Sequence, residues 1–432
     1  MERIGDGLLF FAIAVILTVT VAQSDSSFLF KNLYSNATNF TASVFFKDSV
    51  TAESLKKTFA LADKEADKQA ERETRVSSRR RGPEKIRVLV VPGHDAEFSG
   101  TVFGGLKEVE LNLELGEKLY SLLKTEPAFE VFLTQTWVGY TPYFKKYFEE
   151  NRSQILQFIE THKVAMQNFV NAGQVERVVH VEHNFAPSEV AIRLFGINKW
   201  ANENGIDIVV HVHFNDYPGR KRGREGQYSG FSIYVPESQY SNAKGSKSVA
   251  DSIYERLAKF YPQSNLPMED RGIVEDQELI ALGSNNTLDG AGVLIEYGYI
   301  YESAFSEPTL RNTAMSDLAL QTFLGVMDFF GETPAENLTS VHETEYLPHQ
   351  WNDNLKRGLE ADPDVLRLQA ALAVEGVYPP PGENKNSCSL TGNFGPCTER
   401  SVKAFQQKSS IAPAEGFVGE KTRAKLNELF GK

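Results

Sequence analysis

The alternation of apolar and polar positions becomes regular at residue 86. Residues 86–91 are β-branched and almost entirely apolar, which is typical of a strand buried on both faces. Residues 109–124 then carry apolar side chains at helical spacing, and residues 130–134 have the composition of a second strand. A strand, a helix and a strand in this order predict the start of a parallel α/β sheet.

The same mixture of elements continues to about residue 332. Short apolar runs predict further strands, and amphipathic spacing predicts helices between them. The strands are expected at 206–213, 230–235 and 292–297, and the helices at 191–204, 246–261 and 309–330. We therefore predict that residues 86–332 form one α/β domain, with a mostly parallel sheet flanked by helices.

A long aromatic segment, at about residues 137–185, separates the second strand from the next helix. Its pattern is mostly helical. One interpretation is a pair of helices on the surface of the domain. The other is a lid, or a self-inhibitory segment, that lies near the functional cleft. The sequence leaves both interpretations open.

The N-terminal 85 residues have no sustained strand pattern. Residues 8–22 form an apolar run that is short for a membrane span of about 20 residues and suits the core of a signal peptide. We predict that residues 1–25 are a signal peptide or an N-terminal membrane anchor, and that the protein is exported. Residues 26–85 are predicted to be a polar linker, in which residues 55–75 form a solvent-exposed helix.

A second module is predicted after a polar linker at residues 333–353. Residues 354–432 contain three short amphipathic stretches, at 364–372, 398–407 and 420–429. Three such helices are enough for a small bundle, so we expect a separate three-helix domain at the C-terminus.

The two cysteines of the chain, Cys388 and Cys397, both lie in this module. A close pair in a turn-rich segment favours a local disulfide formed in an oxidising compartment, where it would brace the bundle. The competing interpretation is a zinc site. It lacks the second close pair or the nearby histidine that such sites usually contain.

The overall charge of the chain bears on whether nucleic acid is a partner. The 432 residues carry a formal net charge of -12, which argues against a general affinity for nucleic-acid phosphates. Arg79–Arg81 are the one compact basic cluster near the N-terminus, and a solvated linker explains them. We predict no nucleic-acid partner.

Four polar residues fall where α/β proteins bind ligands, at the carboxyl ends of strands. His94 follows the first strand, and Glu108 starts the next helix. His213 and Glu296 end later strands. Each alone has a structural explanation, such as an exposed histidine or a carboxylate at a helix N-terminus. Together, two histidines and one glutamate are enough protein ligands for a catalytic zinc, and a further carboxylate can act as general base toward an activated water.

The segments around these residues resemble the motifs of the zinc-dependent N-acetylmuramoyl-L-alanine amidases. They occur in the family's order between residues 86 and 330, and they are Val91–Asp95, Leu106–Leu113, His213–Asn215 and Val293–Tyr299. Residues 271–282 are also similar to the region before the last motif. The resemblance implies hydrolysis of the amide between N-acetylmuramic acid and L-alanine in peptidoglycan. It also implies one Zn²⁺ per catalytic domain, with the roles assigned as follows: metal ligands His94, Glu108 and His213, and catalytic Glu296.

The sequence departs from the family pattern near these motifs. The first motif reads Gly-His-Asp-Ala where Gly-His-Gly-Gly is usual, and the last is followed by Tyr301 and Glu302 instead of Ser-Asn. His211 stands two positions before the third ligand, on the same side of its strand as His213. It is a candidate for supporting a ligand, contacting substrate or binding the metal, and a buried structural histidine is the alternative. Asn215 is a further candidate for a supporting or substrate-binding role.

The C-terminal module resembles the three-helix peptidoglycan-binding domain. The resemblance rests on residues 364–378, 394–406 and 416–422. It implies that peptidoglycan is a binding partner as well as the substrate, because a module that tethers an enzyme to its polymer raises the local substrate concentration. An exported location follows, in the periplasm, the cell wall or the extracellular space, with membrane anchorage as one form of it.

Two other functions are compatible with the sequence. A zinc carboxypeptidase acting on peptidoglycan stem peptides would use a similar centre, although such enzymes usually carry His-x-x-Glu, and here His94 and Glu108 are fourteen positions apart. A non-catalytic wall-binding protein would tolerate the loss of Glu296. Neither the stem-peptide chemistry nor an activator protein can be read from the sequence.

Overall fold

The computed structural model describes residues 50–61, 85–178, 186–217, 219–332 and 342–431. The predicted signal peptide or anchor at residues 1–25 lies outside these ranges, as does most of the predicted N-terminal linker. Among the helices of the described ranges, none combines the length and the apolar character that a membrane crossing requires.

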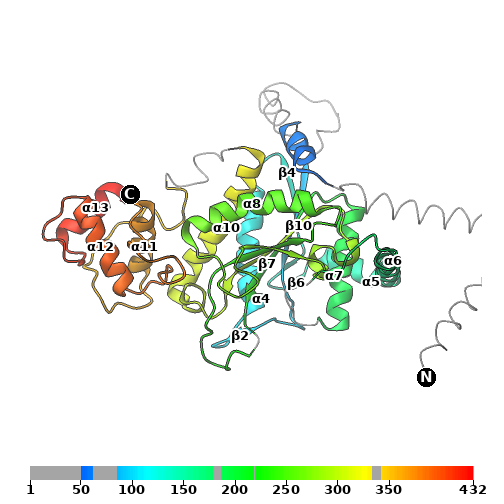
Figure 1. The fold of residues 1–432 in the computed structure, drawn as a ribbon, viewed down its shortest axis with the longest axis horizontal. Coiled ribbons are helices and arrows are strands. Elements are labelled where there is room, and N and C mark those ends of the chain that lie inside the picture. Colours follow the sequence, from blue (N-terminus) through cyan, green and yellow to red (C-terminus); the bar gives the residue numbers. More distant parts are fainter. Residues whose placement is uncertain (1–49, 62–84, 179–185, 218, 333–341, 432) are drawn as a thin grey trace, which may run out of the picture. The chain divides into compact units, whose positions relative to one another are not determined.

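A six-stranded, mostly parallel sheet forms the centre of the predicted α/β domain (Figure 1). The strand order is β4-β1-β7-β10-β8-β9, and only the β10–β8 pairing is antiparallel within this sheet. The strands are β1 Ile86–Pro92, β4 Phe129–Leu133, β7 Ile208–Asn215, β8 Ser232–Pro236, β9 Ile273–Asp276 and β10 Ala291–Tyr299. The predicted fold class is confirmed, and the carboxyl ends of β1, β7 and β10 meet at one edge because these strands are parallel neighbours.

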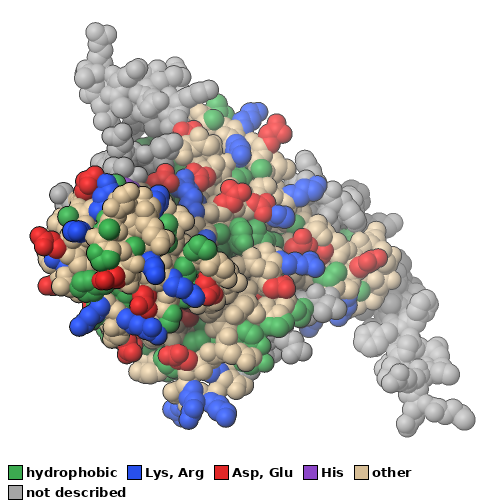
Figure 2. Space-filling model, turned by 60° about the vertical axis from the view of Figure 1, so that its left-hand side comes forward, with side chains coloured by type: hydrophobic (Ala, Val, Ile, Leu, Met, Phe, Trp, Pro, Cys, Tyr) green, Lys and Arg blue, Asp and Glu red, His purple; other side chains and the backbone are tan. Residues whose placement is uncertain are grey.

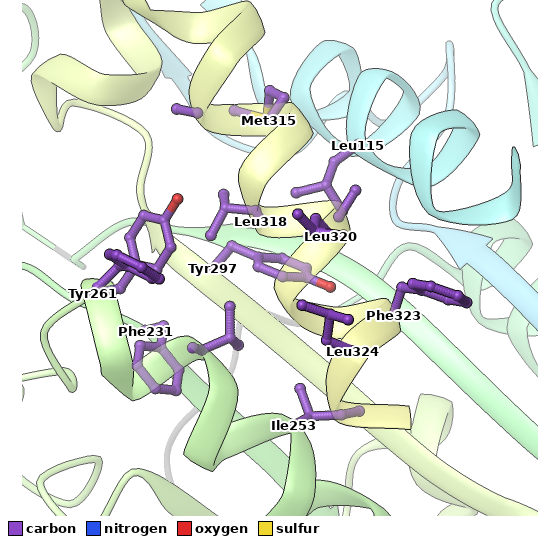
Figure 3. Close-up of a cluster of buried hydrophobic side chains, with 14 of the residues drawn as sticks. Leu115, Phe231, Ile253, Tyr261, Tyr297, Met315, Leu318, Leu320, Phe323 and Leu324 are labelled. Carbon is purple, nitrogen blue, oxygen red and sulfur yellow. The ribbon is translucent and has the colours of Figure 1, made fainter. Parts of the chain in front are cut away.

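Helices cover both faces of the sheet, because side chains of the central strands alternate between two apolar layers. The larger layer includes Val88, Val90 and Ile295 and is covered by α4 Glu108–Leu123, α8 Ala243–Phe260 and α10 Pro308–Phe330. Figure 3 shows part of it, with side chains of α10 lying between those of α4, α8 and β10. The smaller layer includes Leu89 and Val209 and is covered by α7 Ser188–Glu203.

The aromatic insertion forms two helices that lie over α7. These are α5 Pro142–Glu150 and α6 Arg152–Asn171, joined to β4 through the short hairpin of β5 Gln135–Thr136 and β6 Gly139–Tyr140. Phe144 of α5 is buried, with its ring 4.7 Å from that of Trp200 on α7. These contacts favour the interpretation of 142–171 as a surface helix pair. Residues 179–185, where the insertion ends, lie outside the described ranges.

A helical segment at residues 52–61 belongs to the core of the α/β domain. The side chain of Phe59 is only 1% exposed, and its ring stacks 4.3 Å from Phe330 and lies edge-on to Phe129. The prediction of a solvated linker with an exposed helix is therefore wrong for this part. Leu55 and Phe59, four residues apart on this helix, and Val50 just before it belong to the large apolar layer.

The C-terminal module has the three predicted helices, α11 Pro363–Val374, α12 Pro396–Lys408 and α13 Glu420–Phe430. Residues Cys388 and Cys397 are joined by a disulfide. The segment before the module, predicted to be a polar linker up to residue 353, carries buried apolar side chains in its described part: Tyr346, Leu347 and Trp351 are at most 3% exposed. The linker prediction is wrong for residues 344–351, because these large apolar side chains join the core.

The polar anchor of this segment is Asp317 on α10, which is completely buried. Its carboxylate accepts hydrogen bonds from the hydroxyl groups of Thr344 (2.5 Å) and Tyr261 (2.8 Å) and from the N–H of Glu345 (2.9 Å). A buried carboxylate needs such partners. Asp317 therefore fixes the path of the chain as it leaves the α/β domain.

We predict that Phe59→Ala lowers the free energy of unfolding by about 3–5 kcal/mol, because it empties a filled aromatic position. Leu61→Ala on the same helix is the matched control. Its side chain is 56% exposed, and we expect a change of about 0.5 kcal/mol or less. Denaturant unfolding measures both. Equal effects of the two substitutions would mean that this helix is not part of the core.

Candidate active site

The four polar residues predicted from the sequence meet at the carboxyl edge of the sheet. His94 lies two residues beyond the end of β1, and His213 lies two residues before the end of β7. Glu296 pairs directly with His213 in the β10–β7 register. Glu108 is the first residue of α4, which returns over the sheet from the same edge.

Three of these side chains surround one point. The Nε2 atom of His94 lies 2.9 Å from Oε1 of Glu108, and the Nδ1 atom of His213 lies 3.0 Å from the same oxygen. One ligand atom from each residue falls within 4.8 Å of the others. Two imidazole nitrogens and one carboxylate oxygen are the donor set of a catalytic zinc site, so the residues fit the metal that the sequence suggests.

Glu108 is buried, yet it is held in its charged form. Burial alone would raise the pKa of Glu108, but the imidazoles of His94 and His213 hold it well below its usual range. The other carboxylate oxygen, Oε2, accepts the N–H of Thr101 at 3.0 Å. A charged carboxylate suited to binding a cation is therefore available at neutral pH.

Two glycines leave the space that these side chains occupy. A Cβ atom on Gly93 would lie 2.2 Å from Cε1 of His213, and one on Gly100 would lie 2.3 Å from Oε2 of Glu108. Gly100 also has φ +71°, a conformation that favours glycine. No larger residue fits at either position without displacing a proposed ligand.

The loop that carries His94 is fixed by Asp95, one of the departures from the family pattern. His94 has φ 63°, which non-glycine residues rarely adopt. The Asp95 carboxylate accepts the N–H groups of Glu97 (2.9 Å) and Phe98 (3.0 Å) and lies 2.9 Å from the Arg193 guanidinium on α7. Asp95 thus closes a tight turn directly after His94, where the family usually has the more flexible glycine.

Glu296 stands beside the three-residue group in a different electrostatic state. Burial, and then the charges of Glu108 and Glu269, raise its pKa well above the ordinary value. Its Oε2 atom is buried and has no hydrogen-bond partner in the described part of the chain. A buried carboxyl group with a raised pKa and an uncommitted oxygen is suited to accept and return a proton.

His211 is separate from the three-residue group. It is 1% exposed, and the group of potential metal ligands found among the described residues does not include it. Burial, and then the charge of His213, lower the pKa of His211 to about 3, so it is neutral at physiological pH. The structure therefore favours a buried, neutral histidine beneath His213 over an additional ligand.

Asn215 is oriented by a residue that the sequence analysis missed. Its amide donates to Oε1 of Glu269 at 3.0 Å, and Glu269 also accepts the hydroxyl groups of Tyr234 (2.5 Å) and Ser264 (2.6 Å). Glu269 is 1% exposed although it lies in a polar loop. Nothing in the local pattern distinguishes it from a solvated glutamate, because two of its partners come from β7 and β8 and only Ser264 lies nearby in the chain.

Two imidazoles and one carboxylate around a point, beside a proton-transferring carboxyl group, define a candidate metallohydrolase of the α/β class. A family model described as N-acetylmuramoyl-L-alanine amidase matches residues 88–325, and the chain therefore belongs to this amidase family. A second model, described as a putative peptidoglycan binding domain, matches residues 361–426. The resemblances noted in the sequence are confirmed.

Solved structures of amidases are similar to parts of this chain. An N-acetylmuramoyl-L-alanine amidase from Clostridium difficile 630 is 17% identical over 58% of this chain and 99% of its own, with a TM-score of 0.36. The catalytic domain of CwlV from Bacillus (Paenibacillus) polymyxa var. colistinus is 19% identical over 58% and 100%, also with a TM-score of 0.36. CwlD from Clostridioides difficile, solved with the GerS lipoprotein, is 16% identical over 57% and 99%, with a TM-score of 0.37. No curated protein matches the chain in sequence.

We predict that Gly93→Ala lowers kcat/KM for peptidoglycan by about 100-fold or more, because the added methyl group must displace the His213 ring and small displacements at a reacting centre have effects of this size. Glu255→Ala, at an exposed position on α8, is the control because it changes the catalytic region away from this site. Wall-solubilisation kinetics measure both variants. Unchanged turnover in Gly93→Ala would contradict the close packing of this site.

Proposed function

We propose that this amidase is exported and zinc-dependent, with His94, Glu108 and His213 as the metal ligands and Glu296 as the catalytic acid and base. The observation that carries the proposal is the convergence of one carboxylate oxygen and two imidazole nitrogens within 4.8 Å. When bound, zinc supplies a Lewis acid that polarises the scissile carbonyl and makes water a better nucleophile at neutral pH. The residues of the chain account for the remaining steps.

Glu108 and the two histidines set the geometry of the centre before substrate arrives. The N–H of Thr101 holds Oε2 of Glu108 (3.0 Å), and Oε1 faces both imidazoles. Such outer contacts orient a ligand and support its basicity. These contacts would hold the three side chains in place for the metal, which would leave the substrate amide to be bound by it rather than by movement of the ligands.

Glu296 moves the proton in this proposal. It accepts the proton of the attacking water and delivers it to the nitrogen of the leaving L-alanine, which leaves as a free amine. The raised pKa of Glu296, caused first by burial and then by Glu108 and Glu269, lets the protonated carboxyl group persist until that nitrogen needs it. The products are the lactyl carboxylate on the sugar and a stem peptide with a new amino terminus.

The C-terminal module supports peptidoglycan as the polymer to which the enzyme is tethered. The match at residues 361–426 is to a peptidoglycan-binding domain, and tethering raises the local substrate concentration. The disulfide between Cys388 and Cys397 is consistent with an oxidising, extracytoplasmic compartment. A signal peptide or anchor at residues 1–25 would deliver the protein there. Acidic and basic side chains are interspersed over the face drawn in Figure 2, so that this face has no large patch of one sign of the kind that attracts nucleic acid.

We predict that Glu296→Gln lowers kcat by about 10²–10⁴-fold, the usual contribution of general acid–base catalysis, while one zinc ion per chain is still bound. The reaction is followed as new amino groups on L-alanine in purified peptidoglycan, and zinc is counted by metal analysis. Glu255→Gln, at an exposed position on α8, is the matched control and should keep full activity.

The products of the wild-type protein decide between this proposal and its rivals. Released D-alanine in place of a free L-alanine amine would identify a carboxypeptidase. Full hydrolysis by Glu296→Gln would remove Glu296 from the mechanism, and no hydrolysis by the wild-type protein would leave a wall-binding role alone.

We also predict that removal of the metal with a chelator abolishes hydrolysis and that added Zn²⁺ restores it, because the three ligands supply no electrophile by themselves. Sedimentation with insoluble cell wall should be unchanged by the chelator, since the C-terminal module has no part in the metal centre. Chelator-resistant hydrolysis would contradict a metal mechanism.

A further inference from the structure

The loop after β7 contains four basic residues, and the side chain of one of them is buried. Residues 219–225 include Arg220, Lys221, Arg222 and Arg224, and the last three are exposed. The Arg220 side chain is only 6% exposed. A guanidinium group is rarely buried unless its donors are paired, so the contacts of Arg220 require an explanation.

The guanidinium group of Arg220 makes both hydrogen bonds and contacts with aromatic rings. Its Nε and one terminal nitrogen donate to the two oxygens of Asp216, at 2.6 and 2.8 Å. Further hydrogen bonds reach the backbone oxygens of Arg224 (2.9 Å) and Val102 (3.1 Å). The guanidinium carbon lies 5.4 Å from the ring centre of Phe103 and 5.5 Å from that of Tyr301, which are cation–π distances.

These contacts join two segments that carry metal ligands in the proposed function. Asp216 follows the His213–Asn215 motif directly, and Val102 and Phe103 form β2, in the hairpin that leads into Glu108. The hydroxyl group of Thr101 donates to Oδ2 of Asp216. The N–H of the same Thr101 donates to Oε2 of Glu108 at 3.0 Å, and the N–H of Glu108 donates back to the Thr101 carbonyl at 2.9 Å.

We propose that Arg220 is a positioning residue for the metal centre: through Asp216 and Thr101 it fixes the Glu108 carboxylate at bonding distance from both imidazoles. The inference rests on the proposed metal site and adds residues that the family motifs do not contain. The bidentate contact orients Asp216, the Thr101 hydroxyl group follows Asp216, and the Thr101 N–H then directs Oε2 of Glu108. Oε1 is left facing His94 and His213.

The test measures zinc affinity of the full-length protein by competition with a chromophoric chelator, without any assay of hydrolysis. Arg220→Met removes the guanidinium group that orients Asp216. Thr101→Val removes only the hydroxyl group and keeps the N–H that contacts Glu108. We expect each to weaken zinc binding by about 10–100-fold, the usual effect of losing a contact that orients a ligand. Thr101→Ser retains the hydroxyl group and should bind zinc as the wild-type protein does.

Two further variants separate this pathway from general damage. Arg222→Met changes an exposed base in the same loop and should leave zinc affinity unchanged. The double variant Arg220→Met/Thr101→Val should bind zinc no more weakly than Arg220→Met alone, because both substitutions interrupt one chain of contacts. Circular dichroism of the metal-free proteins establishes that each variant is folded, and if Arg220→Met is not, the Thr101 pair decides.

The outcomes are distinguishable from failure of the proposed function. A wild-type protein that binds no zinc would overturn the metal centre itself. A wild-type protein that binds zinc, with folded Arg220→Met and Thr101→Val variants that bind it equally well, would overturn only the positioning role. In that case Arg220 would be a structural residue of the loop.

Discussion

A carboxylate buried at the edge of an apolar sheet is stable only if charges and donors of the right kind surround it, and Glu108 is such a group. Two imidazoles face one of its oxygens and a backbone N–H faces the other. The glycines at 93 and 100, the turn closed by Asp95 and the hairpin before α4 each leave space or supply a partner for this arrangement. The architecture of the site follows from satisfying one buried negative charge.

The sheet makes that arrangement possible because its parallel neighbours bring distant parts of the chain to one edge. His213 and Glu296 are paired across β7 and β10, but their surroundings differ: Glu108 is stabilised in its charged form, whereas Glu296 is pushed toward the protonated form. Two carboxyl groups of one amidase site are thereby given opposite tendencies by their neighbours. In the proposed mechanism this difference suits Glu108 to metal binding and Glu296 to proton transfer, because neighbouring groups that shift two pKa values apart allow one site to perform both tasks.

The local pattern of apolar and polar residues was sufficient to predict the strands and helices whose neighbours are other regular elements. The strands before His94 and around His213 and Glu296 were evident from apolar runs, and parallel pairing then placed those residues together. The pattern failed where burial depends on long-range contact. Phe59 and Trp351 lie in stretches of mixed composition, and both are buried by residues outside their own segment: Phe59 lies against Phe129 and Phe330, and Trp351 bonds to Asp364 and Asn427. Glu269 could not be found for the same reason: its hydrogen-bond donors become neighbours only after folding.

The buried segment at residues 344–351 has a consequence for how the enzyme's two activities can be dissected. Tyr346 bonds to Tyr261, Thr344 bonds to Asp317, and Leu310 of α10 lies against Gly392 of the C-terminal module. Cutting the chain near residue 333 would strip this cover and expose apolar side chains of α10 to water. Poor activity of such a truncated amidase would reflect aggregation as readily as lost tethering. Point substitutions on the exposed surface of the C-terminal module would instead leave its contacts with α10 intact.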